Sequence, residues 1–297
     1  MKHPPILMMI ASTLLFSIQG VCIKFIGMGL PAAEIAFLRS LGTFAIITPY
    51  LFAKGVPFWG SNPRVLIIRG LIGGLALDLT FHALQILPLA TASLLRNLHP
   101  ILIPVFAVFL LKERLVIQNF VGMALALLGV SLLYLPAFNG SWPIDAASYA
   151  VIASVCTAVV MCLIRKLRHT ENAWVIVNYF AMGSLLVTGP GFLLHPVTPS
   201  PVQIGLITVI ILATTLAQLA FTWALGHDKA SKLGLISAIG PVWASIWGVT
   251  LFDELLTIPM VIGGMLILSA TVIVSRIRTA PKADTCPAVP ASSQLRQ

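Results

Sequence analysis

The sequence predicts an all-α membrane protein with ten transmembrane helices in two inverted five-helix repeats. Of its 297 residues, 58% are hydrophobic and only 9% are charged, and the mean hydropathy is +1.00. The Lys and Arg residues gather at one end of the apolar segments, and a Pro–Glu–Gly motif of the first half recurs in the second. These observations predict burial in lipid, an even number of spans and a duplicated unit.

The composition excludes a water-soluble enzyme. Soluble domains carry about 25% charged residues, and the 18 basic and 9 acidic side chains of this chain cannot cover so large an apolar core. The net charge of +9 would suggest nucleic acid in a soluble protein. Basic cytoplasmic loops explain it here, so we expect no nucleic-acid partner. The four cysteines show no metal or disulfide spacing, so we expect neither a metal nor a cofactor.

Apolar runs between polar or Pro/Gly-containing breaks predict the ten spans, each of about 20 residues. They cover residues 5–26, 32–53, 65–87, 91–111, 117–136, 146–164, 173–194, 202–225, 231–252 and 257–276. The first run lacks a small-residue cleavage site and is expected to stay as a helix. Residues 279–297 are polar and rich in proline, which predicts a disordered cytoplasmic tail.

The distribution of basic residues predicts the orientation. With a cytoplasmic N-terminus, fifteen of the eighteen Lys and Arg residues fall in cytoplasmic segments. Arg69 is counted there with Lys54 and Arg64, although the third predicted span begins at residue 65. Lys24, Arg39 and Arg96 are the exceptions, inside or at the rim of spans. The positive-inside rule therefore places both termini in the cytoplasm, and the compact loops favour the inner membrane of a bacterium.

A repeated motif indicates a duplicated five-helix unit. Three residues of the first half recur exactly 141 positions later in the second half. The pairs are Pro100 and Pro241, Glu113 and Glu254, and Gly122 and Gly263. Such a long period predicts two units, residues 1–138 and 139–278.

The flanks of the motif indicate that the second unit is inverted. Because five is an odd number, the first unit ends on the opposite side of the membrane, and the second unit therefore enters in the opposite direction. Glu113 lies between Lys112 and Arg114, as expected on the cytoplasmic side, whereas Glu254 follows Asp253 and has no basic neighbour. Inverted repeats are a common plan of secondary transporters.

The motif residues themselves have predicted structural roles. Pro100 and Pro241 are expected to kink their helices and to free carbonyl groups that face a cavity. Glu113 and Glu254 are expected to cap or anchor helix ends.

The first half contains LPLATASLL, followed by a proline, LLKE and a Gly-rich span. The second half repeats the end of this pattern as a proline, FDE and GG. The pattern resembles the EamA type of the drug/metabolite transporter superfamily over residues 5–276. This resemblance implies ten helices in two inverted EamA repeats and the movement of small metabolites across a membrane. The motif positions belong to the scaffold of that family, so the resemblance implies no substrate site.

Ionisable residues inside spans are functional candidates because lipid makes them unfavourable. Arg39, Asp78, His82, Arg96 and His99 are predicted to line a substrate cavity near the midplane. The i,i+4 and i,i+3 spacings place Asp78 with His82, and Arg96 with His99, on shared helix faces. Arg39 and Arg96 are expected to hold a carboxylate or phosphate, with Asp78 orienting Arg96. The alternative is an Asp78–Arg96 ion pair that only fixes two helices.

Other polar and aromatic residues lie nearer the rim or on second-half helices. Lys24 and Glu34 are expected to form an ion pair at the outer rim or to extend their charged ends to the membrane surface. Trp243 and Trp247 share a helix face, where they either contact the substrate or pack helices.

The sequence therefore predicts a secondary active transporter that moves a small polar, zwitterionic or anionic metabolite by alternating access. The excess of basic over acidic groups inside the spans favours an anionic group. Asp78, His82 and His99 are candidates to carry a coupled proton. Efflux of drugs or hydrophobic compounds is the alternative. No catalytic residue is predicted, because metalloprotease and nucleophile-elbow motifs are absent, and nothing resembles a channel filter.

Overall fold

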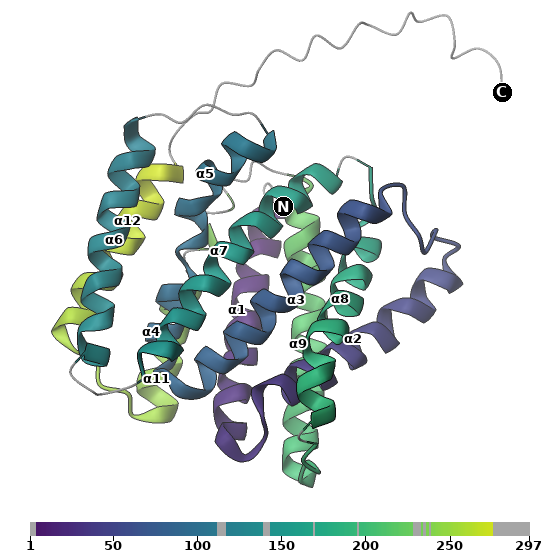
Figure 1. Cartoon of the computed structure of the whole chain (residues 1–297), viewed down its shortest axis with the longest axis horizontal. Coiled ribbons are helices and arrows are strands. Elements are labelled where there is room, and N and C mark those ends of the chain that lie inside the picture. The colour runs from purple at the N-terminus through teal and green to yellow at the C-terminus, as the bar shows by residue number, and fades with distance from the viewer. Residues whose placement is uncertain are drawn as a thin grey trace, which may run out of the picture.

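A computed structural model describes residues 4–111, 117–138, 143–168, 170–194, 196–227, 233, 236–237 and 239–275, and this part of the chain contains helices and no strand (Figure 1). The helices are α1 (Pro4–Ile26), η1 (Gly27–Gly29), α2 (Ala32–Ala53), α3 (Pro63–Ile86), α4 (Leu89–Arg96), α5 (His99–Leu111), α6 (Ile117–Phe138), α7 (Ile144–Leu167), α8 (Ala173–Leu194), α9 (Pro201–Leu225), α11 (Gly240–Phe252) and α12 (Ile258–Ser275). The predicted all-α class is confirmed. Glu113 and the tail 279–297 lie outside the described residues.

The helices have the length and polarity of membrane spans. Six are long and apolar enough to cross a bilayer, and shorter apolar helices accompany them in the second part of each half. Eight predicted spans each coincide with one helix, with ends that differ by three residues at most. Helices satisfy their own backbone groups, which is the condition for crossing lipid.

The fourth predicted span is two helices instead of one. α4 ends at Arg96 and α5 begins at His99, with Pro100 as its second residue. In the second half, α11 begins at Gly240 with Pro241 in its first turn. Proline is tolerated at a helix start because the N–H groups there have no partner within the helix. Both motif prolines therefore lie in the first turn of a helix, where they do not produce the expected kink.

Contacts across the bundle interlock the two halves of the chain. The most extensive helix pairs are α1 with α9, α3 with α7 and α8, α2 with α8, and α6 with α12. Each pair joins a helix of the first half to one of the second, and Figure 1 shows α6 beside α12 at one edge of the bundle. Neither half forms a separate body.

Several of these contacts recur at the spacing of the sequence motif. Equivalent residues of the two halves are 141 positions apart. When both residues of a contacting pair are replaced by their equivalents in the other half, the new pair is also in contact. The contact Arg39–Thr214 corresponds in this way to Phe180–Gly73, Gly42–Ile211 corresponds to Gly183–Gly70, and Thr43–Thr215 corresponds to Ser184–Gly74. The two halves thus use equivalent positions to pack against each other.

Glycine allows α3 and α8 to approach closely. A Cβ atom at Gly183 would overlap the backbone of Gly70, and one at Gly74 would lie 2.8 Å from the Cα atom of Ser184. Small residues permit such backbone contact between membrane helices. This crossing lies next to Phe180 and therefore helps to position the site described below.

Replacing Gly183 by leucine is expected to push α3 away from α8 and to destabilise the protein by about 2–3 kcal/mol. The measurement is the melting temperature of the purified protein in detergent. Gly205→Leu is the matched control, because Gly205 is exposed on α9 and nothing lies within 4 Å of a Cβ atom built there. Equal losses in the two variants would contradict the close approach.

Candidate functional site

A cavity of about 150 Å³ lies inside the bundle. Helices α1 to α5, α7 to α9 and α11 all contribute to its lining, together with Ser237, whereas α6 and α12 contribute nothing. Among the described residues, the charged or titratable ones that line it are Arg39, Arg69, Arg96 and His99, and no described Asp or Glu does. A cavity with this lining carries a positive potential that favours an anion.

Three of the predicted site residues meet at this cavity. Arg39 comes from α2, Arg96 from the end of α4 and His99 from the start of α5. His99 Nδ1 lies 3.0 Å from the carbonyl oxygen of Arg96, across the helix break. The buried Asn97 between them has a side-chain amide nitrogen without a hydrogen-bond partner among the described residues. The break therefore gathers polar groups at the cavity wall.

The structure does not bring Asp78 and His82 into the lining. His82 Nδ1 lies 3.7 Å from Asp78 Oδ2, and its ring packs edge-on against Tyr149 of α7, with centroids 5.9 Å apart. The part of the chain that is described contains no ion pair between Asp78 and Arg96. Asp78 is thus beside His82 and does not orient Arg96 in this structure.

Arg69 is a cavity residue that the sequence analysis placed elsewhere. Its assignment to a cytoplasmic segment is wrong, because α3 begins at Pro63 and Arg69 is 1% exposed within it. The signal was present in the sequence, since Pro63 is a favourable first residue of a helix. A span that begins there carries Arg69 nearly two turns inward.

Arg39 and Arg69 form a buried cluster with Phe180. The central guanidinium carbons of Arg39 and Arg69 lie 4.9 Å and 4.4 Å from the centre of the Phe180 ring. Arg39 Nε donates a hydrogen bond of 3.0 Å to Thr214 Oγ1. A Cβ atom at Gly73 would come within 2.9 Å of the Phe180 ring and 3.1 Å of Arg69 Nη1, so glycine leaves the space for this stack.

Neither predicted tryptophan lines the cavity. Trp247 Nε1 donates a hydrogen bond of 3.1 Å to the hydroxyl of Ser17, which does line it. Trp243 Nε1 is buried and has no hydrogen-bond partner among the described residues. Trp247 therefore contacts the lining residue Ser17 and does not itself line the cavity.

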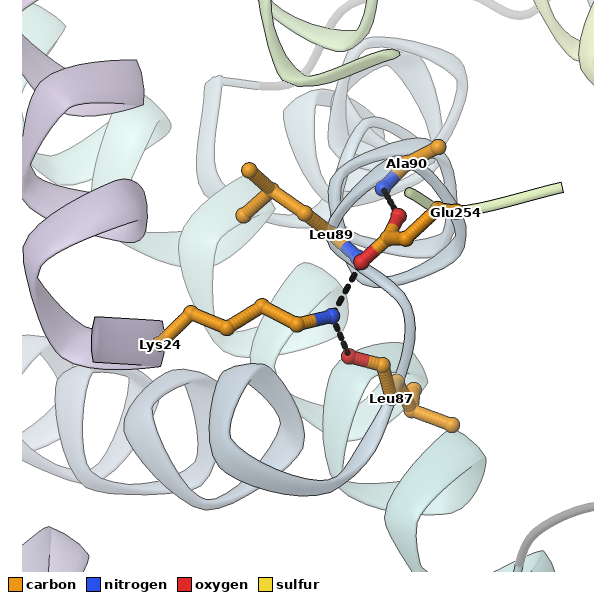
Figure 2. Close-up of polar contacts among 5 residues, drawn as sticks. All are labelled: Lys24, Leu87, Leu89, Ala90 and Glu254. Atoms are coloured by element: carbon orange, nitrogen blue, oxygen red, sulfur yellow. Dashed lines mark hydrogen bonds and ion pairs between the residues drawn. The ribbon is translucent and has the colours of Figure 1, made fainter. Parts of the chain in front are cut away.

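Lys24, Glu254 and the start of α4 form a second polar cluster, which we name the Lys24–Glu254 clasp (Figure 2). Lys24 Nζ pairs with Glu254 Oε1 and donates a hydrogen bond of 3.3 Å to the carbonyl of Leu87. The same carboxylate accepts the N–H groups of Leu89, at 2.8 Å, and Ala90, at 3.5 Å. Glu254 thus caps the positive end of α4, a helix of the other half.

The clasp corrects one prediction and lies near the cavity. The expected Lys24–Glu34 pair is wrong, because Glu34 instead accepts the backbone N–H of Val197 at 3.1 Å. Gly20 and Leu89 line the cavity, and Lys24 lies one turn beyond Gly20 on α1. The clasp therefore ties α1, α4 and the α11–α12 connection together about one helical turn from these lining residues.

The opposite end of the bundle has a different carboxylate contact. Glu171 Oε1 accepts the N–H groups of Ser61 and Asn62, both at 2.7 Å, immediately before α3. Thr170 Oγ1 also accepts a hydrogen bond of 3.0 Å from the Asn62 side chain. These contacts join the α7–α8 connection to the α2–α3 connection.

The comparison with known families explains this architecture. A family model described as the EamA-like transporter family matches residues 3–135 and, a second time, residues 145–276. The chain belongs to the EamA-like transporter family. The name of the family and the two matches point to a transporter.

Individual relatives agree with this assignment. The chain is 29% identical to the pseudopaline exporter CntI of Pseudomonas aeruginosa, over 92% of this chain and 96% of the relative. It is 25% identical to the S-adenosylmethionine uptake transporter of Rickettsia prowazekii, over 65% of this chain and 66% of that protein. The chain also matches a solved crystal structure with a TM-score of 0.67 and 20% sequence identity. The match covers 91% of this chain and 95% of that one, which shows the shared fold.

Removing the carboxylate of Glu254 is expected to destabilise the protein, because Glu254→Ala leaves Lys24 unpaired and the start of α4 uncapped. A lost helix cap and a broken, largely buried ion pair together predict a loss of about 2–4 kcal/mol. The melting temperature in detergent measures it. Asp253→Asn is the control, because Asp253 is exposed and asparagine tolerates its positive φ of 49°. A Glu254→Ala protein as stable as this control would show that the clasp contributes nothing.

Proposed function

We propose that this protein is a secondary active transporter of the inner membrane that moves a small polar metabolite bearing an anionic group, by alternating access. One observation carries the proposal: three arginines and a histidine line one internal cavity, and no acidic residue of the described ranges lines it. A cationic lining of this kind favours carboxylates or phosphates over organic cations. Transport relatives with different cargo names support metabolite transport as the general activity.

We infer that the two halves are related by an approximate two-fold axis in the membrane plane. The support is the set of contacts that recur at the spacing of 141, because a swap of the two halves converts each contact into another. In an inverted repeat the cavity lies between the halves near the midplane. Both termini are then cytoplasmic, in agreement with the basic residues of the loops.

Alternating access requires each end of the cavity to open in turn. At the end where α1 and α3 finish, the Lys24–Glu254 clasp joins three segments from both halves. Opening that end requires the ion pair to separate and the N-terminus of α4 to exchange its cap for water. The contacts of Glu171 hold the other end through backbone groups of the connection before α3.

Ligand-induced stabilisation tests the substrate class. A ligand that binds only the folded state raises the melting temperature, so the purified protein is screened against amino acids, carboxylates, phosphates, nucleotides and cationic drugs. We expect stabilisation by an anionic or zwitterionic class, its loss in Arg96→Gln, and its retention in Arg64→Gln, where the exposed arginine lies outside the cavity. The stabilising compound is then expected to enter or leave proteoliposomes that contain the protein. Stabilisation by cations alone would instead favour drug efflux.

Weakening the clasp is expected to expose the end of α1 to water. Cys22 is buried two residues before Lys24, so it reports on this opening when the other three cysteines are replaced by serine. Glu254→Gln, which keeps an acceptor for α4 but loses the charge, is expected to increase the rate of Cys22 labelling by a water-soluble maleimide severalfold. Asp253→Asn serves as the control. Unchanged labelling in Glu254→Gln would mean that the clasp does not hold this end closed.

A further inference from the structure

The buried Arg39–Arg69–Phe180 cluster has more hydrogen-bond donors than the protein satisfies. Arg39 and Arg69 are 0% and 1% exposed. Arg39 Nη1 and Nη2, and Arg69 Nε and Nη1, are buried and have no hydrogen-bond partner among the described residues. Guanidinium groups present five donors in a fixed fork that matches carboxylate and phosphate oxygens. Four donor atoms therefore remain for a ligand.

No acidic side chain in the described part of the chain neutralises these two cations. The cavity lining lacks Asp and Glu. Asp78 lies beside a histidine of its own helix, and Glu254 is engaged in the Lys24–Glu254 clasp. Glu34 and Glu171 accept backbone N–H groups of distant connections. The described residues therefore leave the two cations without a counter-charge.

Phe180 and Thr214 hold the two guanidinium groups without neutralising them. An aromatic face attracts a cation through its quadrupole, and stacked arginine keeps its N–H groups available. The free energy gained from this attraction is smaller than the hydration free energy that is lost when a charge is buried. Two adjacent like charges add to that loss, so the empty cluster is a destabilised arrangement that an oxyanion would relieve.

We propose that Arg39 and Arg69, stacked on Phe180, form the subsite that binds the carboxylate or phosphate group of the transported molecule. This inference rests on the proposed transport function, and it adds Arg69 as a residue that determines substrate class. Arg96 and His99 line the same cavity and are left to contact the remainder of the molecule. Gly73 is a positioning residue, since a side chain there would displace the Phe180 ring or Arg69.

The test measures binding of simple oxyanions to the full-length protein in detergent. The probes are acetate, succinate and inorganic phosphate, and acetamide and succinamide are the uncharged counterparts. We expect a saturable rise in melting temperature with an anionic probe and none with the amides. The response to carboxylates or to phosphate identifies the oxyanion. Wild-type protein that responds to no anion, or that responds equally to the amides, would overturn the subsite.

Variants separate binding from folding. Arg39→Gln and Arg69→Gln are expected to weaken anion binding by about 10- to 100-fold, as lost charge-assisted hydrogen bonds predict. Their melting temperatures without ligand are expected to equal or exceed that of the wild type, because an uncompensated buried charge has been removed. A purely structural role would lower them. Arg64→Gln should leave both quantities unchanged, and anion binding retained in Arg69→Gln would contradict the assignment.

The outcomes also separate this inference from the proposed function. Loss of anion binding in both arginine variants, with no transport of any panel compound by wild-type proteoliposomes, would refute transport and keep the subsite. Transport that proceeds at the wild-type rate in Arg69→Gln proteoliposomes would refute the subsite and keep transport.

Discussion

A guanidinium group inside a lipid-embedded bundle has to be compensated, because the surrounding hydrocarbon offers neither water nor hydrogen-bond acceptors. In this protein four helices surround two such groups, and among the described residues they compensate the charges only in part. α2 and α3 supply Arg39 and Arg69, α8 supplies the Phe180 ring, and α9 supplies the hydroxyl of Thr214. The close glycine contacts between α3 and α8 lie within a turn of this cluster. The close packing of α3 on α8 and the placement of the two buried charges are thus determined at the same location.

The helices could be predicted from the sequence because apolar runs of membrane length end at proline, glycine or charged residues. Arg39, Arg96 and His99 could be singled out for the same reason, as polar residues in the middle of such runs. Arg69 was missed because the count of basic residues assigned it to a cytoplasmic segment, although it falls within the third predicted span. The partner of Lys24 was missed because a nearby acid, Glu34, lies in the next helix, whereas Glu254 follows 230 residues later. Only tertiary packing brings that carboxylate to α1.

The interlocked halves limit the motions that can open the cavity. All of the most extensive helix pairs join one half to the other, so the halves cannot separate as two blocks. A rearrangement has to move groups that each contain helices of both halves. The α6–α12 pair, whose Gly129 and Gly263 backbones touch, contributes nothing to the cavity lining and can remain together while other helices move. The polar clasp, in contrast, joins α1, α4 and the α11–α12 connection through few atoms.

The contact between Arg39 and Phe180 has a consequence for the history of the chain. The two residues occupy equivalent positions of the two halves, 141 apart, and they touch each other. In an antiparallel dimer of identical five-helix chains, this position would face itself, so that arginine would meet arginine or phenylalanine would meet phenylalanine. A fused gene lifts that restriction and lets one copy mutate alone. The pairing of a cation with an aromatic ring is therefore an asymmetry that requires two copies of different sequence.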